Sequence, residues 1–80
     1  MKVTITVSLR PGVLDPAAET IHRSLGQLGF DGVRSVVQRR VFEVEIANPD
    51  AAAVRAEAEA MADKLLANPV IETFTVDLAE

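Results

Sequence analysis

Residues 9–16 read LRPGVLDP, and this stretch ends one secondary-structure element and starts the next. Pro11 has no backbone N–H to give to a sheet, and Gly12 accepts backbone angles that other residues resist, so a strand stops here. Asp15 then offers a carboxylate as a helix N-cap, and Pro16 suits the first helical position. The stretch therefore predicts a strand before it and a helix after it.

The segments on either side have the matching periodicities. Residues 2–10 alternate, with apolar side chains at the odd positions, which is the pattern of a half-buried strand. From Leu14 to Gly29, apolar residues recur at spacings of three and four and so share one face of the helix expected after Asp15. These residues are Leu14, Ala18, Ile21, Leu25 and Leu28. Gly29 is the natural end of this helix.

A second β-rich stretch covers residues 33–46, and its apolar positions change parity. The odd-numbered ones are Val33 and Val37, and the even-numbered ones are Phe42, Val44 and Ile46. One regular strand cannot keep both sets on one face, so we expect two strands that reverse near residues 38–40. These three residues include no Gly or Asn, which makes a tight two-residue hairpin less favoured. A bulged continuous strand is the alternative.

The second half of the chain repeats the pattern of the first. Asn48-Pro49-Asp50 starts a helix that ends before Asn68-Pro69. One face of this helix carries Ala51, Val54, Ala58, Met61 and Leu65. Its many alanines favour the helix and supply little bulk, so the helix is expected to lie close to a sheet. Residues 70–78 form a closing strand, with Phe74, Val76 and Leu78 on one side.

The order strand, helix, strand, strand, helix, strand over residues 1–80 predicts a single domain of the α+β class. Two split βαβ units give a ferredoxin-like two-layer sandwich, with two helices on one face of a four-stranded antiparallel sheet. The other face of the sheet would be bare. It would carry Thr4, Thr6, Ser8, Glu43, Glu45, Thr73 and Thr75, with apolar Val41 and Ile71 among them. Such a face suits either solvent or a partly polar subunit contact.

The length of the chain favours the subunit contact. A chain of 80 residues has a thin stability margin, and small domains usually gain support from disulfides, metals or association. With no Cys and one His, the first two are effectively excluded. We therefore expect self-association or a partner, and we take Val41, Glu43, Ile71 and Thr73 as the candidate interface.

Composition argues against several other classes of partner. The net charge is −4, and Phe is the only aromatic residue type, so nucleic-acid binding is poorly supported. No apolar run has the length of a signal peptide or a membrane span. The chain is expected to be cytoplasmic and without a membrane partner.

The search for catalytic residues is mostly negative. Without Cys or Tyr, a thiol nucleophile and a phenolic acid are excluded. His22 lies beside the apolar stripe of its helix and is more typical of a boundary residue than of a general base. Glu43 and Glu45 share one strand face, which is more typical of a solvated face than of a carboxylate pair. We expect no catalytic, cofactor-binding or metal-ligating residue in this chain.

Three arginines are candidates for contact with an anion or an acidic partner. Arg10 precedes the start of the first helix, where an anion site can form, although the stretch is short of glycines and is not a P-loop. Arg39 and Arg40 lie at the expected turn. In both places, an arginine side chain that is simply exposed to solvent is the more common interpretation.

Three separate blocks resemble the PurS family of phosphoribosylformylglycinamidine (FGAM) synthase subunits. They are LRPGVLDP at residues 9–16, LGF at 28–30 and LANPVIE at 66–72, and with the element order they cover essentially the whole chain. Two departures are Ala17-Ala18, where Gln-Gly is common, and Arg39, where the family often has Gly. The first matters little, since Ala is a good helix former. The second weakens any statement about the turn geometry.

The resemblance implies a non-catalytic subunit of an ATP-dependent C–N ligase complex in de novo purine (IMP) biosynthesis. In such a complex a glutaminase chain, PurQ, releases ammonia, and a synthetase chain, PurL, uses ATP and Mg²⁺ to join it to formylglycinamide ribonucleotide. The small chain bridges the two, as a homodimer or a pair of dimers. The family supplies no catalytic residue.

Two other functions remain open from the residues alone. A stand-alone ferredoxin-like regulatory or small-ligand-binding domain would have the same element order. An acylphosphatase-type enzyme would need an Asn beside its anion loop, but Asn48 and Asn68 both precede Pro and are better explained as helix punctuation.

Overall fold

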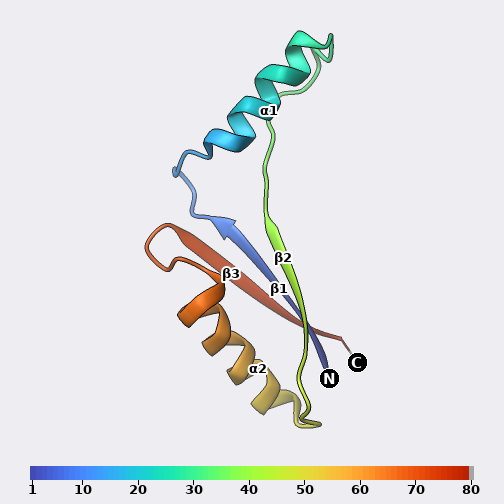
Figure 1. The fold of residues 1–80 in the computed structure, drawn as a ribbon, viewed down its shortest axis with the longest axis vertical. Coiled ribbons are helices and arrows are strands. Elements are labelled where there is room, and N and C mark those ends of the chain that lie inside the picture. Colours follow the sequence, from blue (N-terminus) through green and yellow to red (C-terminus); the bar gives the residue numbers. More distant parts are fainter. Residues whose placement is uncertain (80) are drawn as a thin grey trace.

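Three antiparallel strands and two helices make up the fold in the computed structural model, which describes residues 1–79 (Figure 1). In chain order they are β1 (Lys2–Leu9), α1 (Pro16–Gln27), β2 (Arg40–Glu45), α2 (Ala51–Met61) and β3 (Glu72–Ala79). A π-helical turn, η1 (Ala62–Leu66), continues α2. The strand β1 is central and pairs with β2 on one side and β3 on the other.

Aspartate side chains cap the starts of both helices. The Asp15 carboxylate accepts hydrogen bonds from the backbone N–H groups of Ala17 and Ala18, at 3.0 and 3.3 Å. In the same way, the carboxylate of Asp50 accepts from Ala52 N at 3.1 Å and starts α2. After α1 the chain turns at Gly29, whose φ of +98° favours glycine. The Asp15 cap and the end of the first helix are confirmed. The cap of the second helix is Asp50 and not Asn48, the acceptor of the predicted acceptor-then-proline start; the Asn48 side chain instead accepts a hydrogen bond from Asp50 N at 2.9 Å.

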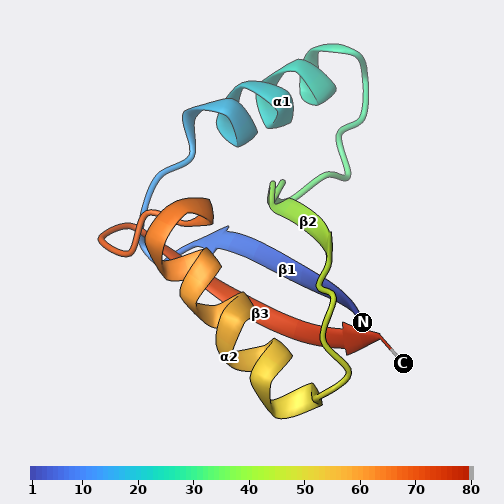
Figure 2. The ribbon, with the colours of Figure 1, turned by 60° about the horizontal axis from the view of Figure 1, so that its bottom comes forward.

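The core lies between the sheet and α2. Val3, Ile5 and Val7 of β1 are at most 1% exposed, and they face Val54 and Ala58, which are fully buried on α2. Figure 2 shows α2 lying along the sheet, which its small buried side chains allow. Phe74, Val76 and Leu78 of β3 pack against the same core, as their alternation predicts.

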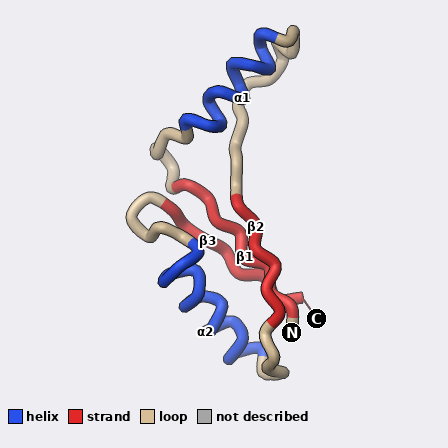
Figure 3. The backbone as a smooth tube through the Cα atoms, viewed as in Figure 1, coloured by secondary structure: helices blue, strands red, loops and turns tan. Residues whose placement is uncertain are grey.

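The predicted four-stranded sheet is not found within one chain. Residues 33–39 run as an extended segment straight into β2, and in the described residues the sheet has three strands (Figure 3). The hairpin expected near residues 38–40 is therefore wrong, and the continuous course, which was the alternative, is nearer to what is found. The reason is local: Gln38-Arg39-Arg40 offers no residue that favours the positive φ of a tight hairpin.

The predicted pair of helices on one face is also wrong. Only α2 covers the sheet, whereas α1 lies beyond its end, joined to it by residues 10–15 and the extended segment (Figures 1 and 3). The molecule measures 49 × 27 × 15 Å and has a radius of gyration of 16.1 Å. A compact chain of this length would have a radius of gyration of about 12 Å. One chain thus leaves α1 without a sheet to cover.

Candidate interaction site

The face of the sheet opposite α2, called here the bare face, carries the side chains predicted for it. In register across the strands, Thr4 lies between Glu43 and Asp77, and Thr6 lies between Val41 and Thr75. The side chains of β2 and β3 on this face are exposed, and Val41 is 58% exposed. Hydroxyl and carboxylate groups around one exposed valine can form a partly polar contact.

The four candidate interface residues are spread along the bare face instead of forming one cluster. Glu43 lies on the row of Thr4, and Thr73 lies on the row of Ser8 near the other end of β1. Ile71 directly precedes β3, is 40% exposed, and accepts a backbone hydrogen bond from Arg10 N at 2.8 Å. Any partner that touches all four must therefore cover most of the length of the sheet.

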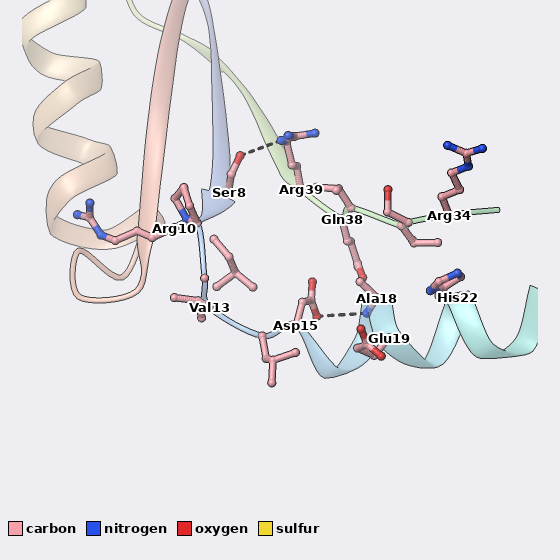
Figure 4. Close-up of a pocket in the computed structure, with 17 residues that line it drawn as sticks. Ser8, Arg10, Val13, Asp15, Ala18, Glu19, His22, Arg34, Gln38 and Arg39 are labelled. Atoms are coloured by element: carbon pink, nitrogen blue, oxygen red, sulfur yellow. Dashed lines mark hydrogen bonds between the residues drawn. The ribbon is translucent and has the colours of Figure 1, made fainter.

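The three candidate arginines are held at separate places by groups of their own chain. Arg10 donates from Nη2 to the Pro69 carbonyl at 2.8 Å, and Arg39 donates from Nε to the Ser8 hydroxyl at 3.0 Å. Figure 4 shows the Arg10 and Arg39 side chains extending in different directions. The structure does not gather them into a common anion site.

Arg40 forms an ion pair that the sequence pattern missed. Its Nη2 lies 2.9 and 2.8 Å from the two carboxylate oxygens of Glu72, and its guanidinium lies 5.8 Å from the centre of the Phe42 ring. Glu72 also accepts from Asn68 N at 2.7 Å. The hydrogen bond from Asn68 and the one from Arg40 lower the pKa of the Glu72 carboxyl. The sequence did contain one sign of this pair. Arg40 and Glu72 are charged residues at positions where the alternation of their strands would place an apolar side chain.

A cavity of about 410 Å³ lies between the end of β1, the start of α1 and residues 34–39 (Figure 4). Ala18, Asp15 and Arg34 are among its lining residues, but Asp15 is engaged as the helix cap. His22 makes a 2.9 Å hydrogen bond between Nε2 and the Val33 carbonyl, which ties α1 to the extended segment. This contact fits the boundary role predicted for His22.

A second hollow is an apolar groove of about 450 Å³ beside the end of α2, called here the α2 groove. It is lined by Val44, Glu57, Ala60, Met61, Lys64, Leu65 and Leu66. Leu65 is 84% exposed and Met61 is 37% exposed, although both belong to the apolar stripe predicted for this helix. The stripe therefore continues past the part of α2 that the sheet covers.

Residues 1–79 contain neither a metal-site cluster nor a membrane-spanning helix. No group of three or more His and acidic side chains in this range has a metal-binding arrangement. In the same range, no helix has both the length and the apolar character needed to cross a membrane.

Comparison with known proteins connects this geometry to one family. Residues 2–80 match the sequence model of PurS, described as phosphoribosylformylglycinamidine (FGAM) synthase. A PurS subunit of this synthase from Synechocystis is 42% identical over 74 residues, which are 92% of this chain and 74% of that protein.

Solved structures share the extended shape as well as the sequence. The crystal structure of PurS from Methanocaldococcus jannaschii has a TM-score of 0.89 and 37% identity, over 99% of this chain and 95% of its own. That protein is described as one of the subunits of formylglycinamide ribonucleotide amidotransferase in the purine biosynthetic pathway.

A third match comes from an assembled complex. A chain in the structure of PurLQS from Thermotoga maritima has a TM-score of 0.86 and 28% identity, over 95% of this chain and 93% of its own. With a family match along residues 2–80, this chain belongs to the PurS family of FGAM synthase subunits.

Proposed function

We propose that this chain is the bridging, non-catalytic subunit of an FGAM synthase complex in the cytoplasm. It would organise a PurQ-type glutaminase and a PurL-type synthetase so that ammonia from glutamine reaches formylglycinamide ribonucleotide. The observation that carries this proposal is the match to a chain of PurLQS over 95% of this chain. In this arrangement ATP and Mg²⁺ act in the synthetase, and this chain contributes surfaces.

The proposed assembly contains two copies of this chain, alone or as a pair of such dimers. The elongated shape, with a radius of gyration of 16.1 Å, supports self-association. We propose the bare face as the surface that meets a further subunit, with Val41, Glu43, Ile71 and Thr73 as contacts. Arg39 contacts Ser8 on this face, Arg10 is hydrogen-bonded to Ile71 beside it, and Arg40 lies on the opposite side of the sheet, in register with Val7. All three are exposed and would offer their remaining N–H groups to acidic side chains.

The decisive experiment is FGAM formation by the purified synthetase and glutaminase of the same organism, with and without this chain. The proposal expects a large gain when glutamine is the nitrogen source and little gain when ammonium replaces it. No gain with glutamine, from partner chains shown to be active separately, would contradict a bridging role. A Tm increase with small metabolites in that case would favour a ligand-binding domain.

Two substitutions test the bare face. Val41→Asp and Ile71→Asp place a carboxylate on exposed apolar positions, so we expect weaker assembly with little change in folding. Ala56→Asp, on the exposed side of α2, is the matched control. The measurements are co-elution with the partner chains and circular dichroism. Unfolding by both bare-face variants would instead place these side chains in the core.

A further inference from the structure

The turn between η1 and β3 brings together residues 9–16 and residues 66–72, two of the blocks that resemble the PurS family. Arg10 joins them, because it donates from its backbone N to the Ile71 carbonyl and from Nη2 to the Pro69 carbonyl, both at 2.8 Å. Residues 68–71, called here the projecting turn, are all exposed. Figures 1 and 2 show this turn, in orange, extending past the end of the sheet.

The projecting turn is held in one shape by hydrogen bonds within the chain. The Asn68 carbonyl accepts from Ile71 N at 3.2 Å and from Glu72 N at 2.8 Å. The side-chain oxygen of Asn68 accepts from Val70 N at 3.1 Å, and Asn68 N donates to the Glu72 carboxylate at 2.7 Å. Pro69 has no backbone N–H. Every backbone N–H of residues 68–72 is therefore satisfied without a partner, and the turn is preorganised for contact.

Val70 lies at the tip of this turn, and neither the core nor the turn explains its apolar side chain. It is 79% exposed, and Ile71 beside it is 40% exposed. Within residues 1–79, only glycines have a positive φ, so the turn asks for no special residue at position 70. A valine has one side-chain torsion and loses little freedom when a partner covers it. The tip is therefore suited to fill a pocket on another molecule.

A cation without a carboxylate partner lies beside this apolar tip. Only one of the N–H groups of the Arg10 guanidinium is used by Pro69, and the others stay available. In residues 1–79 the one ion pair joins Arg40 to Glu72, so Arg10 takes part in none within that range. A surface that offers a carboxylate next to an apolar pocket would match both groups at once.

We propose that the projecting turn is a docking point for a subunit of different sequence, whose surface offers an apolar pocket for Val70 and a carboxylate for Arg10. This inference rests on the heteromeric complex of the proposed function and adds a contact to it. Ile71 connects the projecting turn to the bare face, so one partner can cover both surfaces without a break. Val70 supplies buried apolar area, and Arg10 fixes the orientation of the partner.

A second copy of this chain is a poorer occupant of the turn. A two-fold contact of the turn with itself would place two Arg10 cations face to face, with no free carboxylate to match them. The α2 groove of another copy is apolar and includes Glu57, but it lies away from the turn on the same chain. Such a head-to-tail contact propagates into rings or open filaments. The chemistry of the turn therefore favours a different chain.

Binding to each purified partner chain tests the docking point. Val70→Asp places a carboxylate at the tip, where it would be buried in an apolar pocket. We expect Kd for the partner that the wild type binds to rise by at least about 30-fold, the loss typical of a hot-spot side chain. Ala56→Asp adds the same charge on the exposed side of α2 and should change Kd by less than about twofold. Circular dichroism and sedimentation of the chain alone should be unchanged in both variants.

The salt dependence of Kd tests the part assigned to Arg10. Arg10→Gln removes the cation and keeps the backbone hydrogen bond to Ile71, so binding should weaken and Kd should rise less steeply with salt than in the wild type. Arg10→Lys keeps the charge and should restore the salt dependence. Weaker binding of Arg10→Gln with an unchanged salt dependence would mean that Arg10 only holds the turn, and would overturn the carboxylate contact.

Two results for Val70→Asp would overturn the docking point and leave the bridging function standing. One is binding to the partner chains as tight as that of the wild type. The other is loss of self-association with unchanged binding to the partners, which would show that a second copy covers the turn. A wild-type chain that binds neither partner and gives no gain with glutamine would instead contradict the bridging function, and the docking point with it.

Discussion

At the scale of single residues, the ion pair of Arg40 and Glu72 is the contact with the clearest pH signature. Hydrogen bonds from Asn68 N and Arg40 lower the pKa of Glu72 in the folded state. A carboxyl whose folded pKa is lowered stabilises the fold above its unfolded pKa, about 4.3 for Glu. That stabilisation is lost as the pH falls through the lowered folded pKa. The pair therefore contributes at neutral pH and not in strong acid.

Replacing Glu72 by Gln removes the titrating group while keeping its size. We expect Glu72→Gln to lower Tm at pH 7 and to approach the wild-type Tm as the pH falls below about 4. Thermal unfolding from pH 2 to 7 measures this, and Glu59→Gln on the exposed side of α2 controls for the loss of one acidic charge. An equal Tm difference at every pH would mean that the charge of Glu72 is irrelevant.

At the scale of elements, α2 depends on small side chains where it meets the sheet. Ala58 and Ala62 are fully buried against the core. Ala58→Leu should therefore force the helix away from β1 and lower the free energy of unfolding by about 1 to 3 kcal/mol. Ala56→Leu adds the same atoms at an exposed position and should change it by less than about 0.5 kcal/mol. Urea unfolding of both variants decides this, and equal stabilities would place the packed side of α2 elsewhere.

The elements that the sequence predicts well are those with local causes. The alternation of residues 2–10 predicts β1 to within one residue, and Asp15-Pro16 predicts the start of α1. Asn48-Pro49-Asp50 predicts the start of α2 to within two residues. The extended segment before β2 has no such local cause. Its apolar residues suit a strand, but a strand needs a neighbour, and in one chain residues 33–39 have none in the sheet. The pattern of apolar residues therefore predicts that residues 33–39 are extended, but it does not predict which strand they pair with.

At the scale of the whole molecule, the position of α1 depends on the course of the chain near residues 38–40. Of the apolar face predicted for α1, Ala18 is buried and Leu25 is half-buried, whereas Leu14, Ile21 and Leu28 are exposed. The sheet surface that this helix was expected to cover is not predicted correctly. A reversal at residues 38–40 brings α1 back over its own sheet, and a continuous strand carries it away. The same limit applies to the candidate site. The bare face could be predicted from the alternation of residues along the strands, but the α2 groove could not, because it is open only where α1 lies away from the sheet.

Two turn residues should therefore be enough to change the shape of the molecule. In Gln38→Asn with Arg39→Gly, the Asn-Gly sequence favours the type I′ hairpin that the natural chain lacks. A hairpin returns residues 33–37 to the free edge of their own β2 and places α1 over its own α2 groove. We expect a monomer whose radius of gyration falls from 16.1 Å toward about 12 Å. Small-angle scattering and sedimentation measure both quantities.

Gln38→Ala with Arg39→Ala is the matched control, since it removes the same side chains, including the Arg39 contact to Ser8, without favouring a hairpin. It should keep the elongated, associated form. An Asn-Gly variant that stays elongated would show that the path of residues 33–39 is held by contacts other than the turn. A compact monomer would instead show that one short sequence decides whether the chain completes its own sheet. Gln38-Arg39 would then be the part of the chain that keeps α1 away from its own sheet and leaves apolar surface open to association.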